Sequence, residues 1–282
     1  MKLDVTDLSV RFGGLQALKN VSLAVPDGAV IGLIGPNGAG KTTLFNAISG
    51  FVRTETGHIT YGERDITHMA PHRRAGLGLA RTFQHGGLVP QATVGQNVVM
   101  AQHATMRTGV LAGILGQAAA EERQLRERAS DVLGRLALEQ VANKPVHDLS
   151  HGLIKIVELA CALVREPKVL LLDEPSAGLD PAETADLGAR LRALQEERAI
   201  TTLVIDHDLR LVRHVARHIV VLSFGEVIAE GDWDLVRKDP KVIAAYLGPQ
   251  SGETDTDIRD VGEKKTVDLG QKDDTDVAAR TV

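Results

Sequence analysis

Residues 35–42 read Gly-Pro-Asn-Gly-Ala-Gly-Lys-Thr, and they separate the apolar run 29–34 from the helix-forming run 43–48. This arrangement constrains the fold strongly, because a strand must pass through a glycine-rich loop directly into a helix. Glycines let such a loop curl its N–H groups inward, and the helix adds the positive end of its dipole to the same concavity. The sequence therefore predicts an α/β fold with an anion-binding loop.

The last two residues of this loop suit a nucleoside triphosphate. Lys41 can reach the β- and γ-phosphates as a point charge, and the hydroxyl of Thr42 can ligate the Mg²⁺ that bridges them. The alternative is a glycine-rich turn with a chance Lys-Thr pair, and the strand–loop–helix context argues against it. We therefore expect ATP and Mg²⁺ as ligands.

The composition narrows the class of protein. With 282 residues, 43% of them hydrophobic, the chain can form one large domain or a domain with a subdomain. Its one cysteine, Cys161, lies in an apolar stretch, which excludes an internal disulfide and predicts a small buried side chain in a reducing compartment. We found neither a secretion signal nor an apolar run of the ~20 residues that a membrane span needs. The expected location is cytoplasmic, unless a partner holds the chain at a membrane.

The chain divides into four regions. Residues 1–84 contain β-like runs at 3–10, 21–25 and 30–34, whereas 93–138 is helical in pattern and rich in Ala, Glu and Arg. From 168 onward, apolar runs at 169–172, 201–205 and 218–222 alternate with helix-like segments at 181–198 and 208–216, which is typical of a parallel sheet. Residues 249–282 hold nine acidic and five basic residues and no aromatic one, which predicts a disordered acidic tail. Neither this tail nor the rest of the chain has the excess of basic residues that is typical of a nucleic-acid-binding surface.

Two carboxylates follow the apolar run at 168–172. Asp173 is the expected metal anchor, directly or through water, because a phosphate-loop protein places an acid beside its Mg²⁺ in this way. Glu174 is the candidate base that orients or deprotonates a water attacking the γ-phosphate. The alternative is that both are solvated acids at the end of a strand. The presence of a phosphate loop in the same chain argues against this alternative.

Further motifs, in order along the chain, carry a family resemblance. Gln84 follows Arg-Thr-Phe, residues 149–153 read Leu-Ser-His-Gly-Leu, residues 176–180 read Ser-Ala-Gly-Leu-Asp, and His207 follows Val-Ile-Asp. Together with the phosphate loop and Asp173-Glu174, these motifs resemble those of the ATPase subunit of ABC transporters. The resemblance implies a P-loop NTPase fold of the ABC ATPase type, with a RecA-like core, an antiparallel β subdomain and a helical subdomain. It covers residues 1–248, with the helical subdomain at about 85–165.

The resemblance also implies residue roles. The catalytic residues would be Glu174, His207 and Gln84, and the metal site would comprise Thr42, Gln84 and Asp173. The nucleotide-binding residues would be Phe12, Gly35, Pro36, Asn37, Gly38, Ala39, Gly40, Lys41, Thr42, Thr43, Ser150, Gly152 and Asp180. Two such domains would sandwich two ATP molecules, each site pairing one subunit's phosphate loop with the signature serine of the other.

Three of these assignments have alternatives. His207 could be a structural histidine after a strand, although it could donate to a γ-phosphate as charge builds there. Phe12 could stack on adenine or belong to the core. Ser150 could cap a helix, bind a partner's γ-phosphate, or do both.

Several stretches resemble one subgroup of the family, the ATPases of branched-chain amino-acid uptake systems: residues 12–18, 43–50, 78–84, 227–231 and 239–248. This implies a second, different ATPase subunit, two membrane permeases, an extracytoplasmic binding protein, and a peripheral position on the inner face of the membrane. The apolar run 109–115 would meet a permease, or simply form a buried helix pair. Other cargoes, such as urea, short amides or a lipid precursor, fit the same scaffold. A soluble ABC protein acting on nucleic acid or ribosomes would need tandem ATPases or long coiled coils.

The signature departs from the family pattern at two positions. His151 stands where a glycine or an aromatic residue is usual, and Leu153 stands where a glutamine is usual. The helix that follows is normally arginine-rich, whereas this chain has Ile-Lys-Ile-Val. Since the phosphate loop and Glu174 are intact, we expect a heterodimer with unequal ATP sites.

Overall fold

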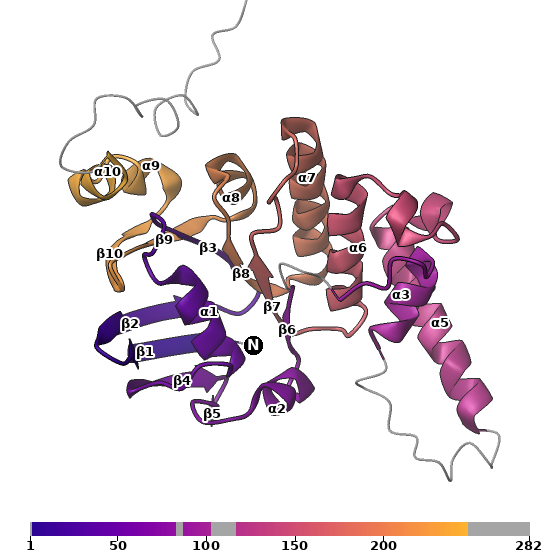
Figure 1. Cartoon of the computed structure of the whole chain (residues 1–282), viewed down its shortest axis with the longest axis horizontal. Coiled ribbons are helices and arrows are strands. Elements are labelled where there is room, and N and C mark those ends of the chain that lie inside the picture. Colours follow the sequence, from indigo (N-terminus) through magenta and orange to yellow (C-terminus); the bar gives the residue numbers. More distant parts are fainter. Residues whose placement is uncertain (1, 83–86, 103–116, 248–282) are drawn as a thin grey trace, which may run out of the picture.

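The protein is seen here as a computed structural model, which describes residues 2–82, 87–102 and 117–247. At its centre is a six-stranded sheet (Figure 1). In spatial order its strands are β10 (Glu226–Gly231), β9 (His218–Ser223), β3 (Val30–Ile34), β8 (Thr201–Ile205), β7 (Val169–Asp173) and β6 (Leu79–Arg81). β10 pairs antiparallel with β9, and all other neighbours are parallel. The carboxyl ends of the parallel strands therefore meet at one edge, where α/β sheets bind ligands.

This sheet is buried on both faces, as parallel sheets usually are. The helices around it are α1 (Lys41–Ser49), α6 (His151–Leu163), α7 (Pro181–Arg198) and α8 (Leu209–Val215). On β7, Val169 and Leu171 belong to the core that contains α1, whereas Leu170 and Leu172 belong to the core that contains α6 and α7. The strand is apolar throughout because both of its faces pack.

A second, four-stranded antiparallel sheet covers α1 from the other side (Figure 1). Its order is β2 (Leu15–Val25), β1 (Leu3–Phe12), β4 (Thr56–Tyr61) and β5 (Arg64–Asp65), and α2 (Pro71–Gly76) follows it. Leu44 and Phe45 of α1 are fully buried in one core with Leu8 and Val10 of β1. The phosphate-loop helix is thus held between the two sheets.

A buried arginine fixes the far end of α1. The Arg74 side chain is 1% exposed, and its guanidinium donates to the carbonyls of Ala47 at 2.7 Å and Ile48 at 2.6 Å. It also donates to the carbonyls of Met69 and Thr67. Burial lowers the pKa of Arg74 to about 10, so the group stays charged at neutral pH. A cation at this helix C-terminus is favourable, because the last carbonyls carry partial negative charge.

A group of helices lies on the side away from the four-stranded sheet (Figure 1). It comprises α3 (Val94–Met100), α5 (Gln117–Arg135), the 3-10 turns η2 (Glu139–Val141) and η3 (Val146–Asp148), and α6. Val98, Leu133, Leu136 and Val157 pack together here, within the core that also receives one face of β7. These helices lie inside the interval 85–165 expected for a helical subdomain. The apolar run 109–115 lies outside the described residues.

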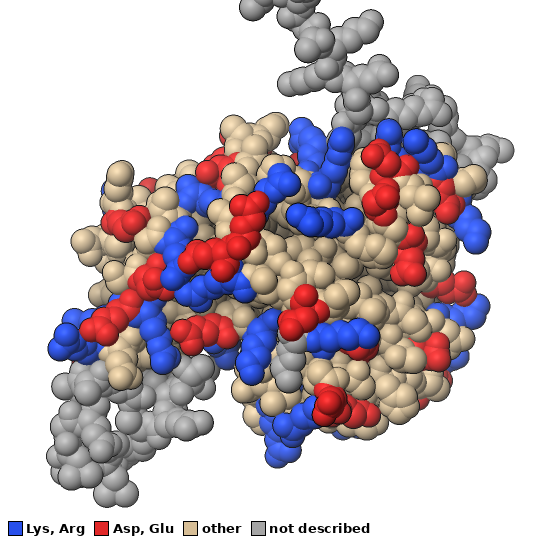
Figure 2. All heavy atoms as spheres, turned by 180° about the vertical axis from the view of Figure 1, so that it is seen from behind, with Lys and Arg blue, Asp and Glu red and all other residues tan. Residues whose placement is uncertain are grey.

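The described chain ends on two short helices, α9 (Trp233–Val236) and α10 (Pro240–Leu247). Val236 and Val242 pack with Val212 of α8 and with Ile219 and Val221 of β9. Among the described residues, no helix combines the length and apolarity that crossing a bilayer requires. On the face shown in Figure 2, acidic and basic side chains are interspersed. The predicted tail, 249–282, lies outside the described residues.

The expected strands at 3–10, 21–25, 30–34, 169–172, 201–205 and 218–222 all lie within observed strands. The segment 181–198 is α7, and 208–216 contains α8. The sequence did not indicate β4, β5, β6 or β10. β5 and β6 are only two and three residues long, which is too short for a clear periodic pattern. β10 holds no fully buried residue, so its alternation of buried and exposed side chains is weak.

Candidate functional site

The glycine-rich loop joins β3 to α1 as expected, and two of its glycines are required sterically. A Cβ on Gly35 would lie 2.0 Å from the carbonyl oxygen of Leu222, and one on Gly40 would lie 2.7 Å from that of Ala17. Both residues have positive φ, 151° and 102°. No side chain fits at either position, because the loop is pressed against β9 and β2. The loop is therefore a preformed feature of the fold.

Lys41 is the first residue of α1, and its side chain folds back over the loop. The ammonium donates to the carbonyl oxygens of Gly35 at 2.7 Å and Pro36 at 3.0 Å, and the residue is 6% exposed. Burial lowers the pKa of Lys41, and the nearby Glu174 carboxylate partly opposes this shift. The loop thus holds a desolvated cation beside the N-terminus of a helix, where an anion is doubly favoured.

A cavity of about 460 Å³ opens over this loop. Residues 37–43 of the loop and of α1 form one part of its lining, and Glu174 and His207 form another. The rest comes from residues 12 and 15–17 on the β1–β2 hairpin and from Phe224. Phe12 is 50% exposed, which contradicts the alternative of a core phenylalanine. The structure adds Leu15 and Phe224, which the sequence gave no reason to select.

Glu174 and His207 are brought together from the ends of β7 and β8. The His207 Nε2 lies 3.0 Å from the Glu174 Oε1. Glu174 has a φ of 48°, and its N–H donates to the carbonyl of Ile205 at 2.8 Å. A left-handed conformation costs a non-glycine residue about 1 kcal/mol. Strain of this kind concentrates at functional sites, and here it turns a carboxylate off the strand end toward the cavity.

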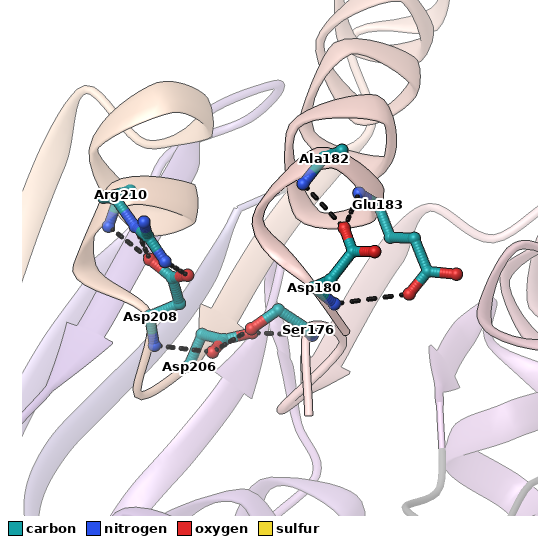
Figure 3. A network of polar contacts seen from close by, with 7 residues as sticks. All are labelled: Ser176, Asp180, Ala182, Glu183, Asp206, Asp208 and Arg210. Atoms are coloured by element: carbon teal, nitrogen blue, oxygen red, sulfur yellow. Dashed lines mark hydrogen bonds and ion pairs between the residues drawn. The ribbon is translucent and has the colours of Figure 1, made fainter. Parts of the chain in front are cut away.

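A buried aspartate joins the loops that follow these two strands (Figure 3). Asp206 accepts hydrogen bonds from the N–H of Ser176 at 2.9 Å, the hydroxyl of Ser176 at 2.6 Å and the N–H of Asp208 at 2.8 Å. Burial raises the pKa of Asp206, while the hydrogen bonds from Ser176 and Asp208 oppose the rise. Asp206 and Ser176 thereby fix the separation of Glu174 from His207. The sequence offered one sign of this, an acidic residue directly after the apolar end of β8, Leu203–Ile205.

The carboxylate of Asp173 is directed away from solvent and bound to an arginine. Arg81 donates to the Asp173 Oδ2 at 2.5 Å and to the Asn46 side chain on α1 at 2.7 Å. The side chains of Arg81 and Asp173 are 8% and 6% exposed. Asp173 is not among the residues that line the cavity over the phosphate loop. Arg81 therefore holds the expected metal anchor at the end of β7, and the sequence did not single it out.

The signature residues lie apart from this cavity. Ser150 caps α6 by accepting from the N–H of Leu153 at 3.3 Å. The N–H of Gly152 donates to the Glu183 carboxylate at 3.1 Å, and the His151 Nε2 lies 3.2 Å from the carbonyl oxygen of Ala177. The start of α6 is thus bound to the first turn of α7 and to the segment that precedes it in the same chain.

Asp180 is the N-cap of α7 (Figure 3). It accepts from the N–H groups of Ala182 and Glu183 at 2.7 and 2.8 Å, and the Glu183 carboxylate accepts from the N–H of Asp180. This reciprocal arrangement is a capping box. Within one chain, Ser150, Gly152 and Asp180 do not meet the phosphate loop. Gln84, expected at the metal and the attacking water, lies outside the described residues.

Comparisons with known proteins agree with this geometry. Residues 18–177 match the ABC transporter family, and residues 226–248 match a family described as branched-chain amino acid ATP-binding cassette transporter. The high-affinity branched-chain amino acid transport ATP-binding protein BraF of Pseudomonas aeruginosa is 40% identical over 248 residues, 87% of this chain and 97% of that protein. A probable branched-chain amino acid transport ATP-binding protein of Archaeoglobus fulgidus is 34% identical over 91% of this chain and 99% of its own length.

Two solved structures extend the likeness to three dimensions. A nucleotide-free ATP-binding cassette from an ABC transporter has a TM-score of 0.78 at 32% identity, covering 88% of this chain and all of the other. The ADP conformation of such a cassette has a TM-score of 0.77 at 31% identity, covering 88% and 99%. These likenesses bear out the expected P-loop NTPase fold. The chain belongs to the ABC transporter family, within the group of branched-chain amino acid transport ATP-binding proteins.

Proposed function

We propose that the cavity over the phosphate loop binds ATP and that this chain hydrolyses it to energise uptake of branched-chain or related amino acids. The observation that carries the proposal is the convergence of residues 37–43, Glu174 and His207 on one cavity. A preformed anion-binding loop, a strained carboxylate and a histidine are the parts that phosphoryl transfer to water requires.

The loop and Lys41 hold the phosphates. The N–H groups at the start of α1 have no partners within the helix, so they are available to phosphate oxygens. Lys41 already lies in the loop, and its ammonium can exchange a carbonyl partner for a phosphate oxygen, which is a stronger, charge-assisted acceptor. Binding the triphosphate also relieves the cost of burying that cation.

Mg²⁺ fits the donors at this site. Within the described ranges, no three His, Cys, Asp or Glu side chains gather as a metal-binding group. The hydroxyl of Thr42, which lines the cavity, suits Mg²⁺, and the carboxylate of Asp173, which lies outside that lining, would act on the ion through a water. Mg²⁺ usually takes one or two protein ligands and completes its shell with phosphates and water. When bound, it would neutralise charge on the phosphates. Arg81 keeps Asp173 oriented at the end of β7.

Glu174 acts on the attacking water. Its carboxylate is partly buried, with a side chain 19% exposed, and it is oriented by the His207 ring. A carboxylate so placed can orient the water and accept its proton. His207, with a side chain 51% exposed, can donate to the γ-phosphate as negative charge builds there.

The signature residues serve a partner's site. Ser150, Gly152 and Asp180 lie away from this chain's own cavity, which fits a head-to-tail sandwich in which they complete the site of a second ATPase subunit. Because His151 and Leu153 depart from the usual pattern, we propose a heterodimer with two unequal ATP sites. In this arrangement the signature residues contact ATP only in the dimer, at the site of the second subunit.

A second cavity, of about 270 Å³, lies between β6, α3 and α6. Exposed Val89 and Met100 lie beside Glu158 and Arg165 in its lining. Cys161 lines it too and is only partly buried, which corrects the expectation of a buried side chain. Desolvation of the thiol, together with the nearby Glu158 carboxylate, raises the pKa of Cys161 to about 12. We propose that a membrane permease contacts this mixed apolar and charged surface. Through that contact the chain would lie on the inner face of the membrane.

Reconstitution tests the cargo. The chain should be assembled with two membrane permeases and an extracytoplasmic binding protein, and ATP turnover measured with leucine, isoleucine, valine, urea and short amides. We expect stimulation by the branched-chain amino acids together with the binding protein. Stimulation by urea or amides instead would assign the other cargo class, and turnover that responds to nucleic acid or ribosomes would overturn an uptake role.

A further inference from the structure

Three large apolar side chains are exposed in the lining of the cavity over the phosphate loop. Phe12, Leu15 and Phe224 are 50%, 67% and 89% exposed, and all three line this cavity. Apolar side chains that gather in the exposed lining of a cavity mark a binding surface. Phe12 and Leu15 end β1 and begin β2, whereas Phe224 comes from the distant turn between β9 and β10. Chain segments far apart in sequence therefore contribute large apolar side chains to the same cavity.

Phe224 occupies a turn position that disfavours it. Phe224 and Gly225 connect Ser223 to its cross-strand partner Glu226, and their φ angles are 47° and 79°. A two-residue hairpin loop with positive φ at both positions is the type I′ arrangement, which favours Asn, Asp or Gly first and Gly second. Phenylalanine at the first position is strained, and such strain concentrates where a side chain has a function.

The turn is also fixed in place. The N–H of Gly225 donates to the carbonyl of Ala39 in the phosphate loop at 2.9 Å, and its carbonyl accepts from the N–H of Lys19 at 2.8 Å. A Cβ on Gly225 would come within 2.7 Å of the carbonyl oxygen of Ala17. The backbone beside Phe224 is therefore held against both the loop and β2, and this fixes the position from which the ring lines the cavity.

We propose that Phe224 is a second adenine-contacting residue, which together with Phe12 forms an aromatic site for the base of ATP. The inference rests on the proposed ATP site. With the phosphates on residues 37–43, the base must contact another part of the lining, and the large apolar side chains of that lining are Phe12, Leu15 and Phe224. Aromatic rings stack on heterocyclic bases, and a larger purine offers more surface than a pyrimidine. Phe224 is then a determinant of nucleotide preference.

Nucleotide titration of the full-length protein tests this. Phe224→Asn removes the ring and suits the left-handed backbone, and Phe224→Tyr keeps a ring. We expect Phe224→Asn to weaken ATP binding about three- to tenfold and to shrink the preference for ATP over CTP. Binding of inorganic tripolyphosphate should change less than about twofold, and Phe224→Tyr should retain the affinity for ATP. The melting temperature of nucleotide-free Phe224→Asn should not fall.

Two controls separate the possible outcomes. Phe51 is 56% exposed just beyond the opposite end of α1, so Phe51→Asn should leave ATP affinity unchanged. Lys41→Ala should weaken both ATP and tripolyphosphate. If Phe224→Asn leaves ATP affinity unaltered while Lys41→Ala abolishes it, the aromatic site is wrong and the ATP site stands. Equal loss of ATP and tripolyphosphate in Phe224→Asn would also overturn the inference, because the effect would then lie in the loop. If Lys41→Ala changes neither ligand, the ATP site itself fails, and the aromatic site fails with it.

Discussion

The phosphate-loop region and the signature region differ in how their polar groups are engaged. Glu174 and His207 lie at strand ends and face an open cavity, together with the start of α1. At the signature, the N–H of Gly152 is already bound to Glu183, and the His151 ring contacts the carbonyl of Ala177. The first region is ready for a ligand, whereas an anion at the second must replace an internal carboxylate.

This difference has a simple energetic meaning. A hydrogen bond exchanged for another of similar strength contributes little net free energy. An anion reaching the N-terminus of α6 therefore gains less than one reaching the N-terminus of α1, where no comparable side-chain carboxylate caps the helix. Variants in the two regions should accordingly have effects of different size.

The largest effect should come from Lys41→Ala. The variant removes the cation that lies in the phosphate loop, so ATP binding should be lost, with at least a hundredfold weaker affinity. Equilibrium titration with a fluorescent ATP analogue measures it. Wild-type affinity in the variant would mean that the loop does not hold the phosphates, and the contrast between the two regions would disappear.

Glu174→Gln should come next, with its effect confined to turnover. The variant keeps the shape of the side chain and the phosphate contacts but removes the base, so we expect a 10²- to 10⁴-fold fall in ATP hydrolysis with ATP still bound. ATP should then favour a closed dimer, which light scattering detects. Turnover of the assembled transporter close to that of wild type would rule out Glu174 as the base.

Arg81→Met should act on stability. Removing one partner of a buried ion pair leaves the Asp173 carboxylate without its counter-ion, at a cost of about 3 kcal/mol in the free energy of unfolding. Thermal or urea unfolding without nucleotide measures this. Arg81→Met/Asp173→Asn should regain part of the loss, because both charges are then absent. If the loss of unfolding free energy in the double variant equals the sum of the losses in Arg81→Met and Asp173→Asn, the ion pair contributes nothing to stability.

The smallest effect should come from repairing the signature. In the assembled complex, His151→Gly/Leu153→Gln should change ATP turnover only several-fold, since one hydrogen bond is worth about 1 kcal/mol. Ser150→Ala is the reference for loss of this region and should cost less than Glu174→Gln. If repair has no effect and Ser150→Ala is as damaging as Glu174→Gln, the two ATP sites are equivalent, and the proposed asymmetry is wrong.

The local motifs could be predicted from the sequence because short-range physics governs them. The loop at 35–42 lies between a strand and a helix as expected, and Glu174 and His207 follow buried strands. Parallel strands bring their carboxyl ends to one edge, so the meeting of these residues followed from the pattern of alternating apolar runs. The short strands β5 and β6 were missed, since two or three residues carry no measurable periodicity.

Contacts between distant segments could not be predicted in this way. In the sequence, Arg81 is only the first residue of the Arg-Thr-Phe run before Gln84, yet in the fold it binds Asp173 across the β6–β7 pair and Asn46 on α1. Nothing in the sequence singled out Glu183, yet it belongs to the capping box of α7 and also binds the N–H of Gly152, 31 residues away. Nothing in the sequence singled out Phe224, which lines the cavity from the turn between β9 and β10. Each of these side chains gains its role from a neighbour that only the folded chain supplies.

The sequence by itself determined the nature of the chemistry: a phosphate loop, a pair of carboxylates and a histidine, each specified by adjacent residues and by the alternation of strand and helix. Only the tertiary structure decided which groups are available and which are engaged. Asp173 is paired with Arg81, Gly152 with Glu183, and Asp206 with Ser176. The reason is physical, because a buried polar group must find a partner, and the packing of distant elements determines which partner lies within hydrogen-bond distance.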